Sequence, residues 1–162
     1  MLSRPLAPFD TWLVQHRDDN YGFAWYCGRG IIVSQVVAAH GSAAAAWSYH
    51  HFEEQVLRDR AVELKRYGGL FVIHDWRAMQ TYDAEARRIW QARMREREKG
   101  YLRGSVVCVA RAGALLKMAV QAANVVTSTV HGVHVELSDN LEQVLRTHKL
   151  DVPPARVSGF FG

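Results

Sequence analysis

One stretch of sequence decides the fold of this chain: residues 69–86, which read GLFVIHDWRAMQTYDAEA. The apolar run from Leu70 to Ile73 predicts a strand that is covered on both faces, and this strand ends in the polar pair His74-Asp75. A short loop follows, and Asp83 begins a helix. Open α/β sheets carry their functional residues at the carboxyl ends of strands. The stretch therefore predicts an α/β fold with its functional region at the end of this strand.

Strands and helices alternate along the rest of the chain. The strands are predicted at residues 21–27, 31–37, 70–73, 105–110 and 133–137, and the helices at 42–67, from 83, at 112–126 and from 139. The first two strands are joined by Gly-Arg-Gly, which predicts a β-hairpin. Strands separated by helices imply right-handed crossovers. We therefore expect a mixed, mostly parallel sheet with an antiparallel hairpin edge and four helices.

Capping residues predict where two of these helices begin or end. Ser42 is a good N-cap for the first helix, which Gly68-Gly69 ends because glycine adopts the left-handed conformation without a steric penalty. Asp139 and Glu142 have the spacing of a capping box, which predicts the start of the last helix.

Length and composition predict one domain in a reducing compartment. With 162 residues, we expect an irregular segment at 1–20, a single domain at 21–150 and a tail at 151–162 that ends in Phe160-Phe161. The net charge of +4 is mild, so nucleic acid is not expected as a partner. No secretory signal or long apolar span is present, and both cysteines lie in apolar runs. We expect a cytoplasmic protein whose membrane contact is at most peripheral.

The order of elements over residues 21–148 resembles the STAS family, the anti-sigma factor antagonist fold, and its lipid-associated STAS/SEC14-like relatives. The resemblance also rests on a local pattern, in which an apolar strand ends in Asp75 and a second aspartate, Asp83, stands at a helix start. It implies a STAS-like α/β fold and a regulatory module in signalling that binds a protein partner. Family antagonists have Asp-Ser-Ser-Gly at this helix start, and one serine is phosphorylated.

This chain has Asp83-Ala84-Glu85-Ala86 at that position, so the phosphorylation switch does not carry over. Glu85 places a permanent negative charge in the first helical turn, where a phosphate would meet the positive end of the helix dipole. One hypothesis is that Glu85 mimics the phosphorylated state. The alternative is that it stabilises its own helix.

Catalytic, cofactor and metal sites are not expected. Adjacent residues of a strand point to opposite faces, so His74 and Asp75 do not form a dyad. The serines lack a nucleophile elbow, and no glycine loop for a nucleotide is present. His50 and His51 diverge on a helix, and His131 and His134 lack a zinc spacing. We expect no enzyme activity.

Two binding hypotheses remain. The first is a non-enzymatic module that binds a protein partner or a second copy of itself, with contacts from Asp75, Arg77, Asp83, Ala84 and Glu85. The helix at 112–126 is apolar over more than one stripe, which favours a homodimer or partner interface. The second is a SEC14-like binder of an apolar or lipid-like small molecule, lined by Trp76, Met79, Tyr82 and Trp90.

Overall fold

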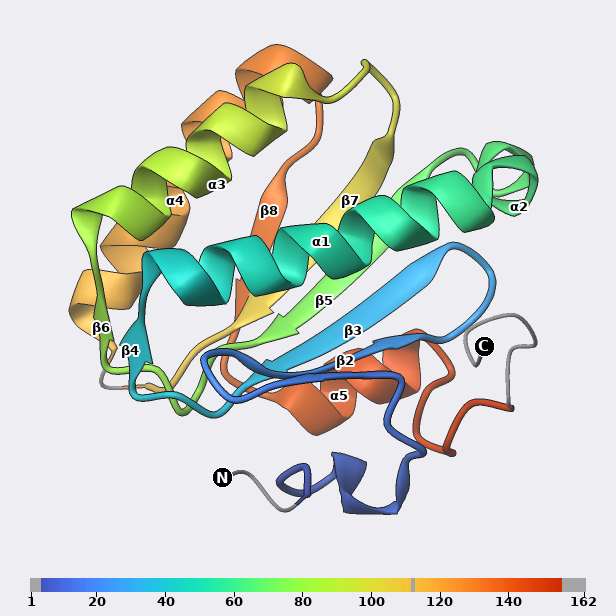
Figure 1. The fold of residues 1–162 in the computed structure, drawn as a ribbon, viewed down its shortest axis with the longest axis horizontal. Coiled ribbons are helices and arrows are strands. Elements are labelled where there is room, and N and C mark those ends of the chain that lie inside the picture. Colours follow the sequence, from blue (N-terminus) through green and yellow to red (C-terminus); the bar gives the residue numbers. More distant parts are fainter. Residues whose placement is uncertain (1–3, 112, 156–162) are drawn as a thin grey trace.

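The computed structural model describes residues 4–111 and 113–155, and they form a six-stranded sheet covered by helices (Figure 1). The strands of this sheet are β1 (His16–Asp18), β2 (Gly22–Tyr26), β3 (Ile31–Val36), β5 (Leu70–Asp75), β7 (Leu102–Cys108) and β8 (Val135–Ser138). The helices are α1 (Ala43–Asp59), α2 (Ala61–Arg66), α3 (Ala84–Glu96), α4 (Ala114–His131) and α5 (Leu141–Thr147). A second, two-stranded sheet pairs β4 (His40–Gly41) with β6 (Thr81–Tyr82), and a 3-10 turn, η1, spans Phe9–Thr11. The predicted α/β class is confirmed.

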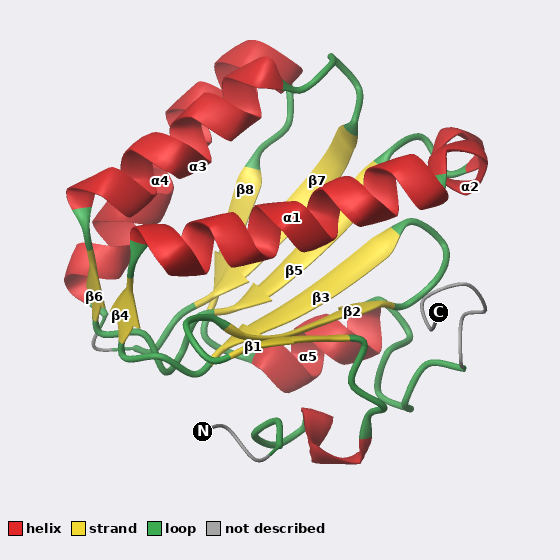
Figure 2. Cartoon of the chain, in the orientation of Figure 1, coloured by secondary structure: helices red, strands yellow, loops and turns green. Residues whose placement is uncertain are grey.

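The strands lie in the sheet in the same order as in the sequence, β1-β2-β3-β5-β7-β8. Strands β1, β2 and β3 pair antiparallel, whereas β3, β5, β7 and β8 pair parallel. Each parallel crossover therefore adds the next strand on the same side of the previous one. Because such crossovers are right-handed, α1, α3 and α4 lie on the same face of the sheet (Figures 1 and 2). Helix α5 and the N-terminal segment cover the opposite face.

Alternation along β5 divides the interior into two cores. Leu70 and Val72 pack with Tyr49 and Val56 of α1 on the face that carries α1, α3 and α4. Ile73 packs on the other face, with α5 and the aromatic side chains of the N-terminal segment. Because His74 follows Ile73, it faces the α1, α3 and α4 layer, and Asp75 faces α5. His74 and Asp75 therefore lie on opposite faces of the sheet and contact different cores.

Two boundaries differ from the predictions at the N-terminal half. Residues 16–18 form β1, so the expectation of an irregular segment over residues 1–20 is wrong there; a three-residue edge strand is too short to show alternation. The predicted helix over 42–67 divides at Arg60, whose φ of −118° is not helical, so the chain has five α-helices in its described part and not four. Its predicted N-cap is confirmed, because Ser42 Oγ accepts from Ala45 N at 3.2 Å.

The C-terminal half shows two further differences. Helix α4 begins at Ala114 and continues to His131, five residues past the predicted end. The N-cap of α5 is Asn140, whose side chain accepts from Gln143 N at 3.0 Å. The predicted capping box at Asp139 is therefore wrong, since Asp139 instead pairs with Arg111 at 2.7 Å. Phe160 and Phe161 lie outside the described residues.

Candidate ligand-binding site

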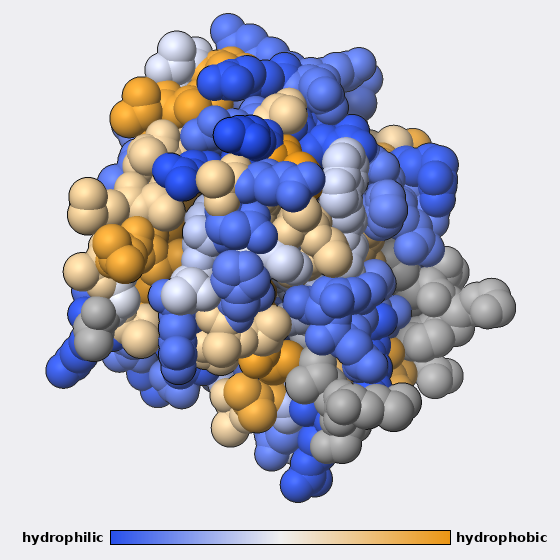
Figure 3. All heavy atoms as spheres, turned by 60° about the vertical axis from the view of Figure 1, so that its left-hand side comes forward, coloured by the Kyte–Doolittle hydropathy of each residue, from blue (hydrophilic) through white to orange (hydrophobic). Residues whose placement is uncertain are grey.

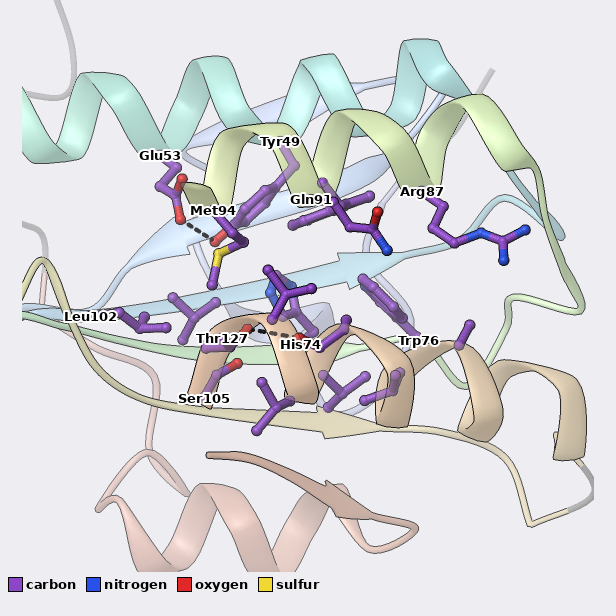
Figure 4. Close-up of a pocket in the computed structure, with 18 of the residues that line it drawn as sticks. Tyr49, Glu53, His74, Trp76, Arg87, Gln91, Met94, Leu102, Ser105 and Thr127 are labelled. Carbon is purple, nitrogen blue, oxygen red and sulfur yellow. Dashed lines mark hydrogen bonds between the residues drawn. The ribbon is translucent and has the colours of Figure 1, made fainter. Parts of the chain in front are cut away.

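A cavity lies between the sheet and the helices α1, α3 and α4 (Figure 4). The space open to the centre of a water molecule is about 80 Å³, and a single bound water needs roughly 10–15 Å³. Its walls come from β5, β7 and β8 below and from the three helices above and beside them. The cavity remains because α3 and α4 run over the sheet without filling the space between them: α4 lines it with small and medium side chains, Ala119, Val120, Ala123, Val126 and Thr127.

Four aromatic side chains in mutual contact form part of the cavity wall. Tyr49 stacks on Trp90, with ring centroids 4.9 Å apart, and His74 meets both rings edge to face at 4.9 and 5.4 Å. Trp76 closes the group at 5.6 Å from Trp90. Packed rings of this kind lose little entropy when a ligand binds, because their rotamers are already fixed.

A buried hydrogen-bond chain fixes His74. Tyr21 donates its hydroxyl proton to Ser34 Oγ at 2.8 Å, and Ser34 Oγ lies 2.8 Å from His74 Nδ1. Burial lowers the pKa of His74 to about 3, with the nearby Glu53 opposing the shift. The imidazole is therefore neutral at physiological pH.

The carboxylate in the cavity wall, Glu53, is held by three partners. Arg97 Nη2 lies 3.1 Å from Glu53 Oε2, His50 Nδ1 lies 3.3 Å from the same oxygen, and Tyr49 donates to Oε1 at 3.3 Å. Burial by itself would raise the pKa of Glu53, but the contacts with His50 and Arg97 outweigh it and the pKa is lowered. The ion pair links α1 to the C-terminal end of α3, and the ionised Glu53 is not available as a general acid near neutral pH.

The cavity opens beside the first half of α3. Arg87 and Gln91 lie one turn apart there; in Figure 4 the Arg87 side chain extends outward and Gln91 lies over the cavity. Arg87 is exposed and forms no ion pair with any residue of the described part. The opening therefore combines one cationic and one amide side chain with an apolar interior.

The structure brings together the four residues predicted to line a ligand site. Trp76, Tyr82 and Trp90 line the cavity, and all three join Met79 around a smaller adjoining hollow. Sequence reasoning missed the contributions of Tyr49 and His74 and those of β7 and α4. The one signal in the sequence was the apolar character of the third predicted helix, which carries no information on which strands it covers.

The five residues predicted to contact a partner divide into two groups. Asp75 is buried and bonds Gln35 and Arg77 on the α5 face of the sheet. Asp83 caps α3, where its Oδ1 accepts from Ala86 N at 2.6 Å, and Ala84 and Glu85 are exposed in the first turn. The two groups share no hydrogen bond or ion pair.

Comparisons with protein-family models, curated proteins and solved structures found no match. Over residues 4–111 and 113–155, no three His, Cys, Asp or Glu side chains are grouped as metal ligands would be. Within the same ranges, no helix has both the length and the apolar character needed to cross a membrane.

Proposed function

We propose that this protein is a non-enzymatic binder of a small apolar molecule, which it holds in the cavity between the sheet and α3 and α4. The observation that carries the proposal is the cavity itself, a preformed space with a nearly continuous apolar and aromatic lining. Ligand sites in proteins combine such a lining with a few polar groups that orient the ligand. In this cavity, His74 in the interior and Gln91 at the opening are the polar groups positioned to orient a ligand.

The chemistry of the walls favours binding over catalysis. His74 is a poor general base, because its pKa is about 3. Glu53 is engaged by Arg97 and His50, and the hydroxyl of Thr127 donates to the backbone oxygen of Ala123. Burial raises the pKa of both free thiols, Cys27 and Cys108, which belong to the opposite core. Buried, unpaired thiols also support a cytoplasmic location.

A titration with ethylbenzene tests the proposal. Trp76 and Trp90 line the cavity, so their indole N–H signals report its occupancy by NMR. Ala123→Phe places a ring inside the cavity and is expected to abolish the ethylbenzene shifts, whereas Ala92→Phe adds the same ring on an exposed position of α3 and leaves them intact. Equal shifts in both variants, or no shifts in the wild-type chain, would overturn the proposal. Native mass spectrometry of the purified chain supplies a second test through any retained apolar molecule.

A second function is favoured by one surface, the outer face of α4. Leu115, Met118 and Val125 are 77, 64 and 65% exposed there, with the exposed Ala122 between the last two. Their spacing of three and four residues is that of a seam between packed helices. Helix α4 carries one charged residue, Lys117, so two copies of it do not repel. Apolar surface is also visible on this side of the molecule in Figure 3. We propose self-association through α4, as a regulatory module of the STAS-like kind.

Sedimentation of the full chain tests this second function. Met118→Glu puts a charge into the seam and is expected to convert a dimer into a monomer. Val62→Glu is the control, because Val62 is an apolar residue on α2 that is 87% exposed, more than Met118 itself. A wild-type monomer over the whole concentration range, or a dimer that resists Met118→Glu, would exclude self-association through α4.

A further inference from the structure

The hydrogen-bond chain behind the cavity has a direction, and the direction determines which proton His74 carries. The phenol of Tyr21 has one proton and gives it to Ser34 Oγ. The hydroxyl proton of Ser34 is then free to be donated to His74 Nδ1, 2.8 Å away. If Nδ1 carried the proton instead, both neighbours would donate to Ser34 and its own proton would have no acceptor in the chain. In the arrangement in which each hydroxyl proton has an acceptor, Ser34 donates to Nδ1, and the imidazole proton is therefore on Nε2.

Trp76 lies beside the start of this hydrogen-bond chain. Its indole nitrogen can only donate; burial raises the pKa of the Tyr21 phenol, and the contacts of this phenol with Ser34 and Trp76 partly offset the rise. Trp76 Nε1 is buried and forms no hydrogen bond with any of the described residues. The direction of the chain therefore rests on the contacts of Ser34 Oγ with Tyr21 and with His74 Nδ1.

His74 Nε2–H is consequently a donor with no acceptor in the described part of the chain. The residue is only 7% exposed, and it lines the cavity among the rings of Tyr49, Trp76 and Trp90. Of the other polar groups in the walls, Thr127 donates to a backbone oxygen of its own helix and Tyr101 donates to Met94 Sδ, and the hydroxyl of Ser105 also lines the cavity. A donor that faces an apolar cavity without a protein acceptor is the place where a ligand oxygen gains most from a hydrogen bond.

We infer that the ligand is a neutral, largely apolar compound with one oxygen acceptor of the carbonyl type, which accepts a hydrogen bond from His74 Nε2. The inference rests on the proposed ligand-binding function and adds the chemical class of the ligand. The group that meets His74 is neutral because the described interior walls hold no free cation: the Arg97 guanidinium pairs with Glu53 and Glu54, and Arg87 lies at the opening. A carboxylate beside His74 would lose its hydration without gaining a counter-charge.

Two ligands that differ by one carbonyl group test this inference. Acetophenone and ethylbenzene have nearly the same shape, and both are titrated against the wild-type chain and His74→Phe. We expect acetophenone to bind the wild-type chain about three- to tenfold more tightly than ethylbenzene, because one added hydrogen bond contributes about that much. We expect acetophenone and ethylbenzene to bind His74→Phe equally. Benzoate is expected to bind the wild-type chain more weakly than acetophenone.

The outcomes separate the inference from the function on which it rests. Equal binding of acetophenone and ethylbenzene to the wild-type chain overturns the carbonyl preference and leaves the cavity a binding site. Tighter binding of benzoate overturns neutrality. No binding of any compound overturns the proposed function as well. Nitrogen-15 NMR of the wild-type histidines provides a test that needs no variant: we expect a neutral His74 protonated at Nε2, with its Nε2–H signal shifted by acetophenone and much less by ethylbenzene. A proton on Nδ1 would overturn the inference.

Discussion

The guanidinium of Arg77 donates two hydrogen bonds to the carboxylate of Asp75, from Nε to Oδ1 at 2.8 Å and from Nη2 to Oδ2 at 3.1 Å. Gln35 Nε2 donates to the same carboxylate at 2.9 Å from the neighbouring strand. Asp75 is 3% exposed, so the pair closes the end of β5 against the α5 face. Two-point pairing of this kind is among the strongest polar contacts in proteins.

Removal of Arg77 is predicted to destabilise the fold. Arg77→Ala leaves a buried carboxylate with the Gln35 amide and a backbone N–H as its remaining donors. We expect the free energy of unfolding to fall by about 3 kcal/mol, the lower end of the range for breaking a buried pair, because Arg77 itself is partly exposed. Urea unfolding measures the loss. The control is Arg88→Ala, an exposed arginine of α3, for which a change within about 0.5 kcal/mol is expected. Similar values for the two variants would mean that the pair contributes nothing.

Acid is predicted to weaken the protein through His74. Burial lowers the pKa of His74 to about 3, against 6.5 in the unfolded chain. Between these values the unfolded state binds more protons than the folded state, so stability is lost as the pH falls below 6.5. The loss is about 1.4 kcal/mol per pH unit, or about 2 kcal/mol between pH 7.5 and pH 5.0. Urea unfolding at these two pH values measures this difference in the free energy of unfolding.

His74→Phe isolates the contribution of this one group. Burial also lowers the pKa of His16 and of His148, and these histidines keep their share of the pH dependence in the variant. We expect the variant to lose about 2 kcal/mol less than the wild-type chain over the same pH interval. If the two proteins lost the same amount, His74 would titrate normally in the fold.

Local sequence signals predicted the elements well, and non-local geometry decided the rest. Ser42 and Asp83 cap helices as predicted, because a cap depends on residues within one turn. The strand order depends on how distant segments pair, and nothing in a single sequence specifies it. The cavity is a consequence of that order, since three helices on one face must share the sheet beneath them. His74 was predicted only as part of the polar end of a buried strand; its Ser34 partner lies 40 residues away, beyond the reach of any local pattern.

The two glycines that end α2 are predicted to respond differently to the same substitution. Both have left-handed backbone, with φ of +76° at Gly68 and +112° at Gly69. A Cβ at Gly68 meets open space, so Gly68→Ala is expected to cost about 1 kcal/mol from backbone strain alone. A Cβ at Gly69 would lie 2.7 Å from Gly100 O and 2.9 Å from Tyr101 O, so Gly69→Ala is expected to cost about 3 kcal/mol or more. Thermal unfolding ranks the pair, and the reverse order would contradict the packing of this turn on β7.

Two substitutions of Asp83 distinguish its structural role from a role in partner binding. Its carboxylate caps α3 and lies 3.4 Å from His40, and both functions stabilise the start of the helix. Asp83→Ala is expected to lower the free energy of unfolding by about 1 kcal/mol, whereas Asp83→Asn keeps the cap and is expected to lose less than half of that, since only the charge is removed. Urea unfolding of the two variants measures the difference. If Asp83→Asn were as unstable as Asp83→Ala, the carboxylate charge and not the cap would hold this helix start. If Asp83→Asn were stable but altered self-association, Asp83 would contact the second copy directly, and the interface would extend from α4 to the first turn of α3.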